Sequence, residues 1–173
     1  MTIAVADTRL ADAPKGYEEP GRQLLVDVKR HGWRTNSIAE RPGYAGFSYT
    51  SGFWVTLGVA EVIAFDLTAE TRHNLFAKMA SEIGAGRTFA PGAPVAGLLD
   101  DEPVWFVPCG RAQADAYLGG THWLYRGAEF PAWQLVWPDM AGRFPWDAGF
   151  DPGLAGVQPD LSGTGDWGGL AKA

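Results

Sequence analysis

Cysteine is nearly absent from this sequence of 173 residues, in which Cys109 stands alone. A disulfide framework within one chain is therefore excluded. Cys109 comes at the end of the apolar run that begins at Val104. A nucleophilic cysteine needs a base or an electropositive setting, and no local base is visible in the sequence. We therefore expect a buried structural thiol.

Long apolar runs are missing as well. No stretch reaches the roughly 18 consecutive apolar residues that a membrane-spanning helix needs. The first 13 residues carry Asp7 and Asp12 and lack the positively charged start of a secretory signal. The sequence therefore predicts no membrane partner and a cytoplasmic location.

Positive charge is in short supply. The 14 lysines and arginines are outnumbered by 20 aspartates and glutamates, so the formal net charge is −6. A basic footprint is the first requirement for binding nucleic acid. The densest basic group, Lys29, Arg30 and Arg34, is typical of a solvated helix end. We expect no nucleic-acid partner.

Histidine is also scarce, with only His31, His73 and His122 in the chain. No two of them are spaced at i, i+2 or i, i+4, and the sequence contains neither an HExxH nor a CxxC motif. Each single histidine is better explained by a structural role, at a helix end or beside an apolar helix face. The sequence predicts no metal site and no cofactor.

The remaining composition favours one globular domain. A chain of this length, with 46% hydrophobic and 20% charged residues, can build a single core. We assign residues 20–161 to a single α+β domain. Residues 1–19 have no apolar period and residues 162–173 are rich in glycine, so both are predicted to be flexible tails, with Trp167 as the one anchor candidate.

Apolar spacing and helix-ending residues predict the elements. A helix is expected from the N-cap Thr68 to Gly84, with the apolar stripe of Phe76 and Met79 on one face. Further helices are expected at residues 21–30 and 112–126, and strands at residues 33–38, 47–53, 61–67, 104–107 and 133–137. Gly119 and Gly120 each cost a helix about 1 kcal/mol against alanine, so a break there is an open alternative.

These elements define the predicted fold class. We expect an α+β domain with an antiparallel or mixed sheet of five to six strands, packed by about three helices. A barrel-like curl of the sheet is an open option. A flavin-binding split barrel is a third idea for function, and it rests only on that option.

Several segments form an ordered set along the chain. The most specific is Trp137-Pro138-Asp139, followed by Gly142 and Pro145-Trp146. The others read HGW at residues 31–33, GFSYTSG at residues 46–52, WQLV at residues 133–136 and QP at residues 158–159. This set resembles domain of unknown function family 4262, found mostly in bacteria, over about residues 27–161. The resemblance implies the fold and its bounds and brings no activity with it.

One segment departs from the pattern of that family. Relatives commonly have Gly-His-Pro-Glu before the third strand, and the matching residues here are Gly58-Val59-Ala60-Glu61. The histidine and the proline are absent, so a role of that histidine in relatives does not carry over to Val59.

Asp139 is the most interesting carboxylate. It follows Trp137-Pro138 at a strand end, where functional sites commonly form, and it could equally bond the backbone of a turn toward Gly142. Gln134, Tyr49 and Asp139 could converge on one polar site. Both alternatives stay open from the sequence.

Eight tryptophans are the strongest compositional feature. They indicate either an aromatic core or an aromatic-lined pocket with a few polar groups. Our leading hypothesis is a small-molecule-binding or peptide-binding accessory protein with a tryptophan-lined pocket. The ligand-binding residues would be Thr50, Gln134, Trp137 and Trp146.

The alternative hypothesis is an enzyme. It would use Asp139 with Tyr49 or His31 as acid–base groups. No set of nucleophile, base and orienting group is legible in the sequence, so binding leads. Whether the chain is catalytic, and whether it forms a homodimer, stays open.

Overall fold

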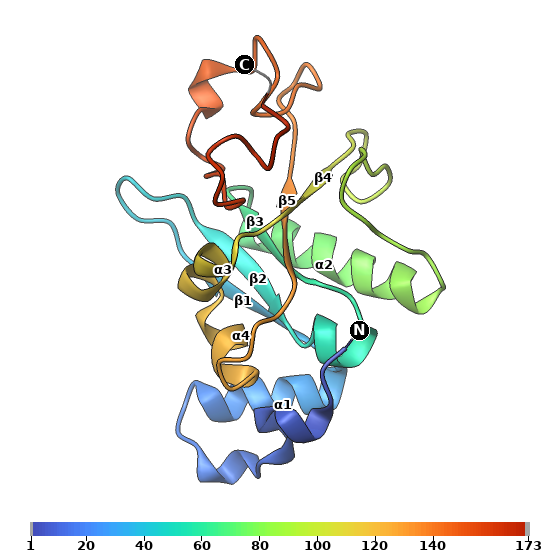
Figure 1. Ribbon diagram of the computed structural model, residues 1–173, viewed down its shortest axis with the longest axis vertical. Coiled ribbons are helices and arrows are strands. Elements are labelled where there is room, and N and C mark those ends of the chain that lie inside the picture. The colour runs from blue at the N-terminus through green and yellow to red at the C-terminus, as the bar shows by residue number, and fades with distance from the viewer. Residues whose placement is uncertain (1, 172–173) are drawn as a thin grey trace.

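One open, mixed β-sheet organises the protein, as seen in a computed structural model that describes residues 2–171 (Figure 1). The strand order is β1-β2-β3-β5-β4, with β3 and β5 parallel and the other neighbours antiparallel. The strands are β1 Arg34–Ile38, β2 Phe47–Ser51, β3 Glu61–Phe65, β4 Trp105–Pro108 and β5 Ala132–Val136. The predicted α+β class and the five strands are confirmed.

The sheet does not close into a barrel, because β1 and β4 form its two separate edges. The barrel option of the sequence is therefore wrong, and the split-barrel idea that rested on it loses its basis. Ser51 is the last residue of β2, and the chain then turns into the π-helix η4, Phe53–Leu57, so the strand predicted at residues 47–53 ends earlier than expected and Phe53 lies outside it.

Four α-helices accompany the sheet: α1 Gly21–His31, α2 Ala69–Gly84, α3 Arg111–Tyr117 and α4 Gly119–Leu124. The Thr68 side chain caps α2 by accepting a hydrogen bond from the Thr71 N–H at 3.0 Å. The predicted third helix is split at Leu118, directly before the two glycines, which is the break that the sequence left open. No helix within residues 2–171 is long and apolar enough to cross a bilayer.

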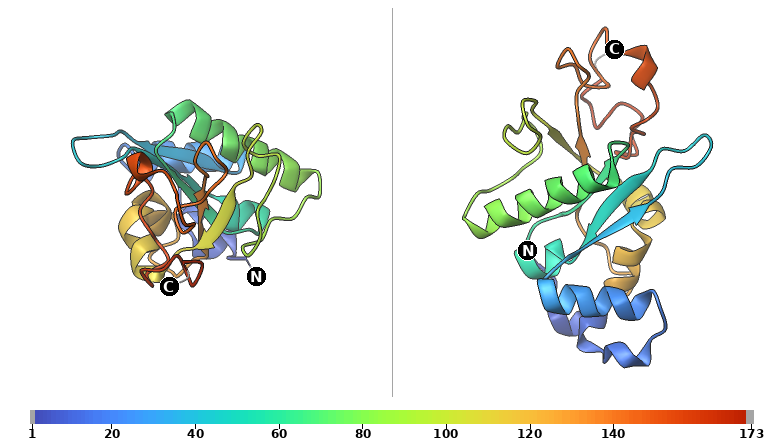
Figure 2. Two further views of the ribbon diagram at one scale, coloured as in Figure 1. Left: turned by 90° about the horizontal axis from the view of Figure 1, so that it is seen from above. Right: turned by 180° about the vertical axis from the view of Figure 1, so that it is seen from behind.

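The helices cover the sheet from both sides. Figures 1 and 2 show α2 along one face and α1, α3 and α4 along the other. Alternation along β3 explains this arrangement: Val62 and Ala64 pack in the core under α2, whereas Ile63 and Phe65 pack in the core with α1, α3 and α4. Every residue of β3 is buried, as its continuous apolar run predicted.

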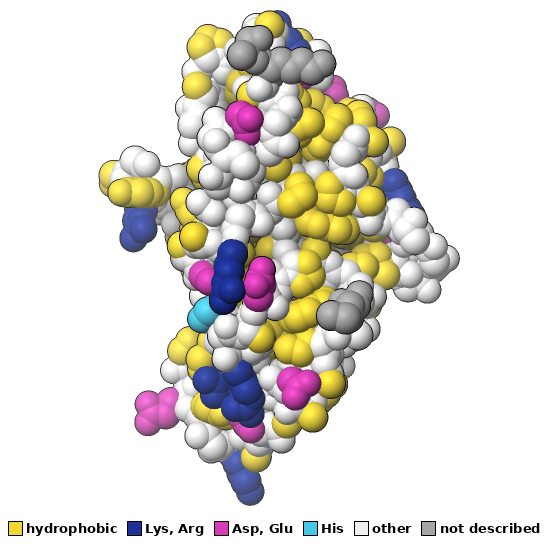
Figure 3. Space-filling model, in the orientation of Figure 1, with side chains coloured by type: hydrophobic (Ala, Val, Ile, Leu, Met, Phe, Trp, Pro, Cys, Tyr) yellow, Lys and Arg dark blue, Asp and Glu magenta, His cyan; other side chains and the backbone are white. Residues whose placement is uncertain are grey.

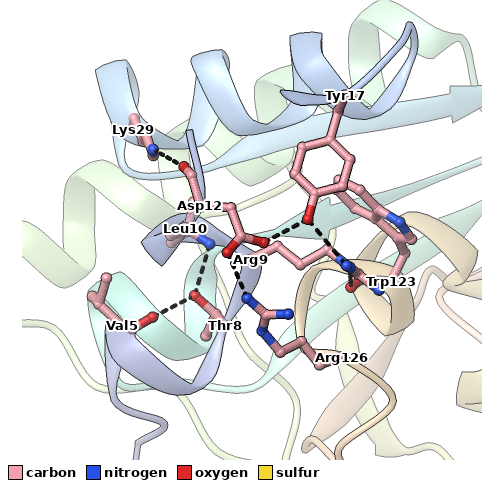
Figure 4. Close-up of polar contacts among 9 residues, drawn as sticks. All are labelled: Val5, Thr8, Arg9, Leu10, Asp12, Tyr17, Lys29, Trp123 and Arg126. Carbon is pink, nitrogen blue, oxygen red and sulfur yellow. Dashed lines mark hydrogen bonds and ion pairs between the residues drawn. The ribbon is translucent and has the colours of Figure 1, made fainter. Parts of the chain in front are cut away.

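The N-terminal segment is docked on α1 and α4 through three short 3-10 helices, Val5–Asp7, Arg9–Ala11 and Pro14–Gly16 (Figure 4). Arg9 Nε donates to the Trp123 carbonyl at 2.8 Å. Asp12 accepts from the Tyr17 hydroxyl at 2.5 Å and from Arg126 Nη2 at 2.7 Å. The sequence indicated none of these contacts for its expected tail.

The chain after β5 folds back over one end of the sheet (Figure 1). Gln134 holds this segment, because its Nε2 donates to the Pro159 carbonyl at 2.7 Å and its Oε1 accepts from the Leu161 N–H at 3.1 Å. Trp167 packs against Trp146 with ring centroids 5.5 Å apart. Met1, Lys172 and Ala173, the ends of the two expected tails, lie outside the described residues.

Charges of both signs lie side by side on the face shown in Figure 3, and apolar side chains gather over β4 and β5. Arg111 pairs with Glu129 at 3.1 Å, and His122 contacts Asp115 at 3.1 Å. These pairs are exposed or half-exposed, so each contributes little to stability.

Candidate functional site

A cavity of about 510 Å³ opens between β1, β2, α1 and α4. Its apolar lining includes Leu24 and Trp123, and its polar groups include Arg34, Asn36 and Tyr49. Sites for small molecules are typically 300–1,000 Å³, mostly apolar, with a few placed polar groups. The cavity has this composition and is our candidate functional site.

Strand register brings the three polar side chains to one face of the sheet. Asn36 lies opposite Tyr49, and Arg34 lies opposite Ser51, in the antiparallel pair of β1 and β2. Residues two apart on a strand point the same way, so Arg34 and Asn36 share the face on which Tyr49 packs with Ile63.

Tyr49 presents an unused proton to the cavity. Its hydroxyl oxygen accepts a hydrogen bond from the Gly120 N–H at 3.0 Å, and within residues 2–171 its O–H has no acceptor. Burial raises the pKa of Tyr49, because it disfavours the phenolate. The group is therefore a neutral hydrogen-bond donor at physiological pH.

Asn36 presents an acceptor. Its Nδ2 donates to Ser51 Oγ at 2.9 Å and to the Tyr49 carbonyl at 3.4 Å. A carbonyl can only accept, so this bond fixes which end of the amide is the nitrogen. The Oδ1 atom faces the cavity and has no hydrogen bond to any residue that the structure describes.

Gly120 keeps the space between these two groups open. A Cβ at this position would lie 3.1 Å from the Tyr49 hydroxyl, 3.2 Å from Leu24 Cδ1 and 3.6 Å from Asn36 Oδ1. The neighbouring Gly119 has open space at the same point. Any side chain at position 120 would therefore intrude into the cavity.

Arg34 is the positively charged group of the cavity. Its Nη1 lies 3.3 Å from Asp27 Oδ2, an ion pair in which both side chains are about a quarter exposed. The Nη1 atom is buried and has no hydrogen bond, and no other N–H of Arg34 makes one within residues 2–171. Nη1 is enclosed beside Asp27, so the donors that the guanidinium keeps available are those of Nε and Nη2.

Glu61 is a second polar centre, and the sequence analysis assigned it no role. Its carboxyl is fully buried at the start of β3. Oε1 accepts from the N–H groups of Gly52 and Trp54 at 3.0 and 3.1 Å and from the Tyr125 hydroxyl, while Oε2 accepts from the Thr50 hydroxyl at 2.5 Å.

This carboxyl holds the turn from β2 into η4. Burial raises the pKa of Glu61, and the hydrogen bonds from Thr50, Tyr125, Trp54 and Gly52 oppose that shift. A glutamate directly before a continuous apolar run was the sequence signal for it. The glutamate is also the part of the Gly-His-Pro-Glu pattern that this chain retains.

Asp139 is buried in the turn after β5. Its Oδ1 accepts from the N–H groups of Ala141 and Arg143, both at 2.9 Å, and its Oδ2 accepts from the Asp151 N–H at 3.0 Å and from Arg143 Nε at 3.2 Å. Burial opposes ionisation, and these backbone donors outweigh it, so the pKa of Asp139 is lowered. This is the turn alternative of the sequence analysis.

The predicted ligand-binding residues make hydrogen bonds and ring contacts within the protein itself. Thr50 is buried and bonds Glu61 and the Val62 N–H, the latter at 2.9 Å. Trp137 Nε1 donates to the Phe65 carbonyl at 3.0 Å. Trp146 is stacked on Phe144 with ring centroids 5.0 Å apart.

Within residues 2–171 the hydrogen bonds of the Gln134 side chain go to the C-terminal segment alone, as described above. It shares a row of the sheet with Tyr49 and is separated from it by Ile63.

His31 lies at the exposed end of α1 and lines a different cavity, of about 670 Å³, with Trp33, Arg34 and His73. Within residues 2–171 no contact joins any two of Asp139, Tyr49 and His31. The structure therefore does not assemble the acid–base set of the enzyme hypothesis in one place.

Across residues 2–171 no three histidine, cysteine, aspartate or glutamate side chains are grouped so that they could hold a metal ion. Burial raises the pKa of the Cys109 thiol to about 12, and the charge of Asp160 adds to this shift. The thiol is thus protonated at neutral pH.

Comparison with known proteins finds one family. A family model described as domain of unknown function (DUF4262) matches residues 27–151. No curated protein and no solved structure matches the chain. The matched region includes Arg34, Asn36, Tyr49 and Trp123, whereas the start of α1, which also lines the cavity, precedes it.

Proposed function

The chain belongs to the DUF4262 family, and we propose that it binds a small molecule in the cavity between β1, β2, α1 and α4. One observation carries the proposal. The Tyr49 hydroxyl, the Asn36 amide oxygen and the Arg34 guanidinium meet in one apolar cavity, and each keeps a hydrogen-bonding capacity that the described residues do not use. Buried polar groups are normally satisfied, so unused groups at a cavity wall favour a ligand.

The walls of the cavity are held before any ligand arrives. The Arg9 guanidinium lies 4.8 Å from the Trp123 ring centroid, and the Tyr17 ring packs edge-on against Trp123 at 5.2 Å. Gly120 and Tyr49 are joined by their hydrogen bond. A preformed site loses less entropy on binding, which supports binding as the role of this cavity.

The enzyme hypothesis has weaker support. It requires Asp139 beside Tyr49 or His31, and the Asp139 oxygens are taken by four N–H donors of its own turn region. We also propose a location in the bacterial cytoplasm, as the sequence predicts.

Two adjacent glycines provide the experiment. Gly120→Ala places a methyl group 3.1 Å from the Tyr49 hydroxyl, whereas Gly119→Ala places it in open space on the same helix. A small-molecule library is screened by thermal shift against the wild type and both variants. We expect hits that stabilise the wild type and Gly119→Ala and lose their effect on Gly120→Ala.

Two outcomes would contradict the proposal. Hits that stabilise both glycine variants equally would place the ligand elsewhere. A library without any hit on the folded wild type would remove the support for a small-molecule site.

A further inference from the structure

We infer that the ligand of this cavity is a small organic monoanion, a carboxylate on an apolar or aromatic body, held by Arg34 and Tyr49. The inference rests on the proposed function and adds the chemical class of the ligand. It follows from the balance of donors and acceptors in the cavity.

On the two strands that line the cavity, β1 and β2, donors outnumber acceptors. Tyr49 offers its O–H, and Arg34 offers N–H groups that make no hydrogen bond within residues 2–171. The Asn36 Oδ1 atom is the matching acceptor on the strand. A ligand that satisfies such a wall must bring mainly acceptors, and a carboxylate brings two oxygens without a proton.

The charge of Arg34 favours an anion over a neutral acceptor. Its ion pair with Asp27 joins Nη1 to Oδ2 at 3.3 Å. Asp27 is also engaged by Gln23, whose Nε2 donates to its Oδ1 at 2.8 Å. A guanidinium has a planar fork of five donors, so it can hold a second carboxylate on its other edge.

The rest of the lining limits the ligand. Glu18 stands at the cavity with an exposed side chain, and its negative charge disfavours a ligand with more than one negative charge. Leu24, Ile38 and the Trp123 ring supply apolar surface. A monoanion with a flat apolar body fits these walls.

The test uses two probes of matched size and shape, indole-3-acetate and indole-3-acetamide, titrated calorimetrically into the full chain. The amide carries a neutral NH2 donor where the acid carries a charged oxygen acceptor. Both present a carbonyl oxygen and the same aromatic body. We expect the acid to bind about 10-fold tighter or better, because a charge-assisted hydrogen bond is roughly twice as strong as a neutral one. The preference should shrink at high salt, because the Arg34 side chain is partly exposed.

Two charge-matched variants locate the effect. Arg34→Gln should abolish the preference for the acid and leave the affinity for the amide close to that of the wild type. Arg30→Gln removes the same charge from an exposed position of α1 and should keep the preference. Unfolding curves without probe show whether each variant is folded, and the wild-type comparison stands if Arg34→Gln is not.

The outcomes separate the two claims. If the amide binds as tightly as the acid, and Gly120→Ala abolishes both, the cavity is a ligand site and the inferred class is wrong. A preference for the acid that survives Arg34→Gln would also overturn the inference. If neither probe nor any library compound binds, the proposed function itself fails.

Discussion

Glu61 offers the sharpest test of what holds the turn from β2 into η4. Glu61→Ala removes the acceptor of four donors in the interior: two backbone N–H groups and the hydroxyls of Thr50 and Tyr125. A buried donor left without an acceptor costs about 1–3 kcal/mol. The hydroxyls can rotate toward other acceptors and the backbone groups cannot. We therefore expect a loss of about 3–5 kcal/mol in the free energy of unfolding.

Glu61→Gln is the matched control, because it keeps the shape and an acceptor oxygen. It should cost clearly less than Glu61→Ala in urea unfolding at pH 7. A cost below about 1 kcal/mol for Glu61→Ala would refute the assignment of this carboxyl as the support of the turn into η4, since a loss of that size is typical of a surface change.

The difference in stability between the wild type and Glu61→Gln should change with pH in a defined direction. The pKa of Glu61 is raised in the folded state, so the folded protein binds this proton more tightly than the unfolded chain does. The resulting stability is present at low pH and is lost as the pH rises through the folded pKa. The stability of the wild type relative to Glu61→Gln should therefore increase as the pH falls from 8 toward 5. An opposite slope would mean that the carboxylate form is the one the site favours.

Three further predictions concern the stability of the fold and the location of the binding site. Phe76→Ala should cost about 3–5 kcal/mol in denaturant unfolding, because the ring is fully buried beneath α2; an unchanged midpoint would contradict this. Deletion of residues 2–13 should lower the thermal midpoint by roughly 2–8 °C, because it removes the contacts of Arg9 with Trp123 and of Asp12 with Arg126; an unchanged midpoint would support the flexible tail that the sequence predicts. Asp139→Asn should lower stability and leave probe binding of the folded protein unchanged, whereas lost binding at full stability would move the site to Asp139.

The helices and strands could largely be predicted from the sequence. The Thr68 cap and the apolar stripe of Phe76 and Met79 were sufficient for α2, and continuous apolar residues were sufficient for the buried β3. Both signals are local, because they arise from period and capping within one element. The split at Leu118 was also visible locally, through the glycine pair that follows it.

The candidate site was only partly predictable. Tyr49 was named from its place in an apolar strand, but the sequence paired it with Asp139 instead of with its strand neighbour Asn36. Arg34 was interpreted as a charge at a helix end. Only the antiparallel register of β1 and β2 places Arg34 and Asn36 beside Tyr49, and the loop of residues 39–46 does not specify that register by itself.

The docking of the N-terminal segment could not be predicted from the sequence either, because it depends on contacts between residues that are far apart in the chain. Arg9 and Trp123 are 114 positions apart, and neither belongs to a periodic pattern from which their contact could be predicted. The Asp139 carboxylate accepts hydrogen bonds from its own turn and also from the Asp151 N–H, which lies 12 positions further along the chain. Contacts of this kind depend on tertiary structure and leave no local signal.

The most direct test of the small-molecule site is a two-dimensional amide NMR titration of the full chain with indole-3-acetate. The account predicts that the Gly120 backbone amide and the Asn36 side-chain amide shift with the probe, while the amides of Ala141 and Arg143 around Asp139 do not. Shifts centred on Ala141 and Arg143, with Gly120 and Asn36 unmoved, would contradict it.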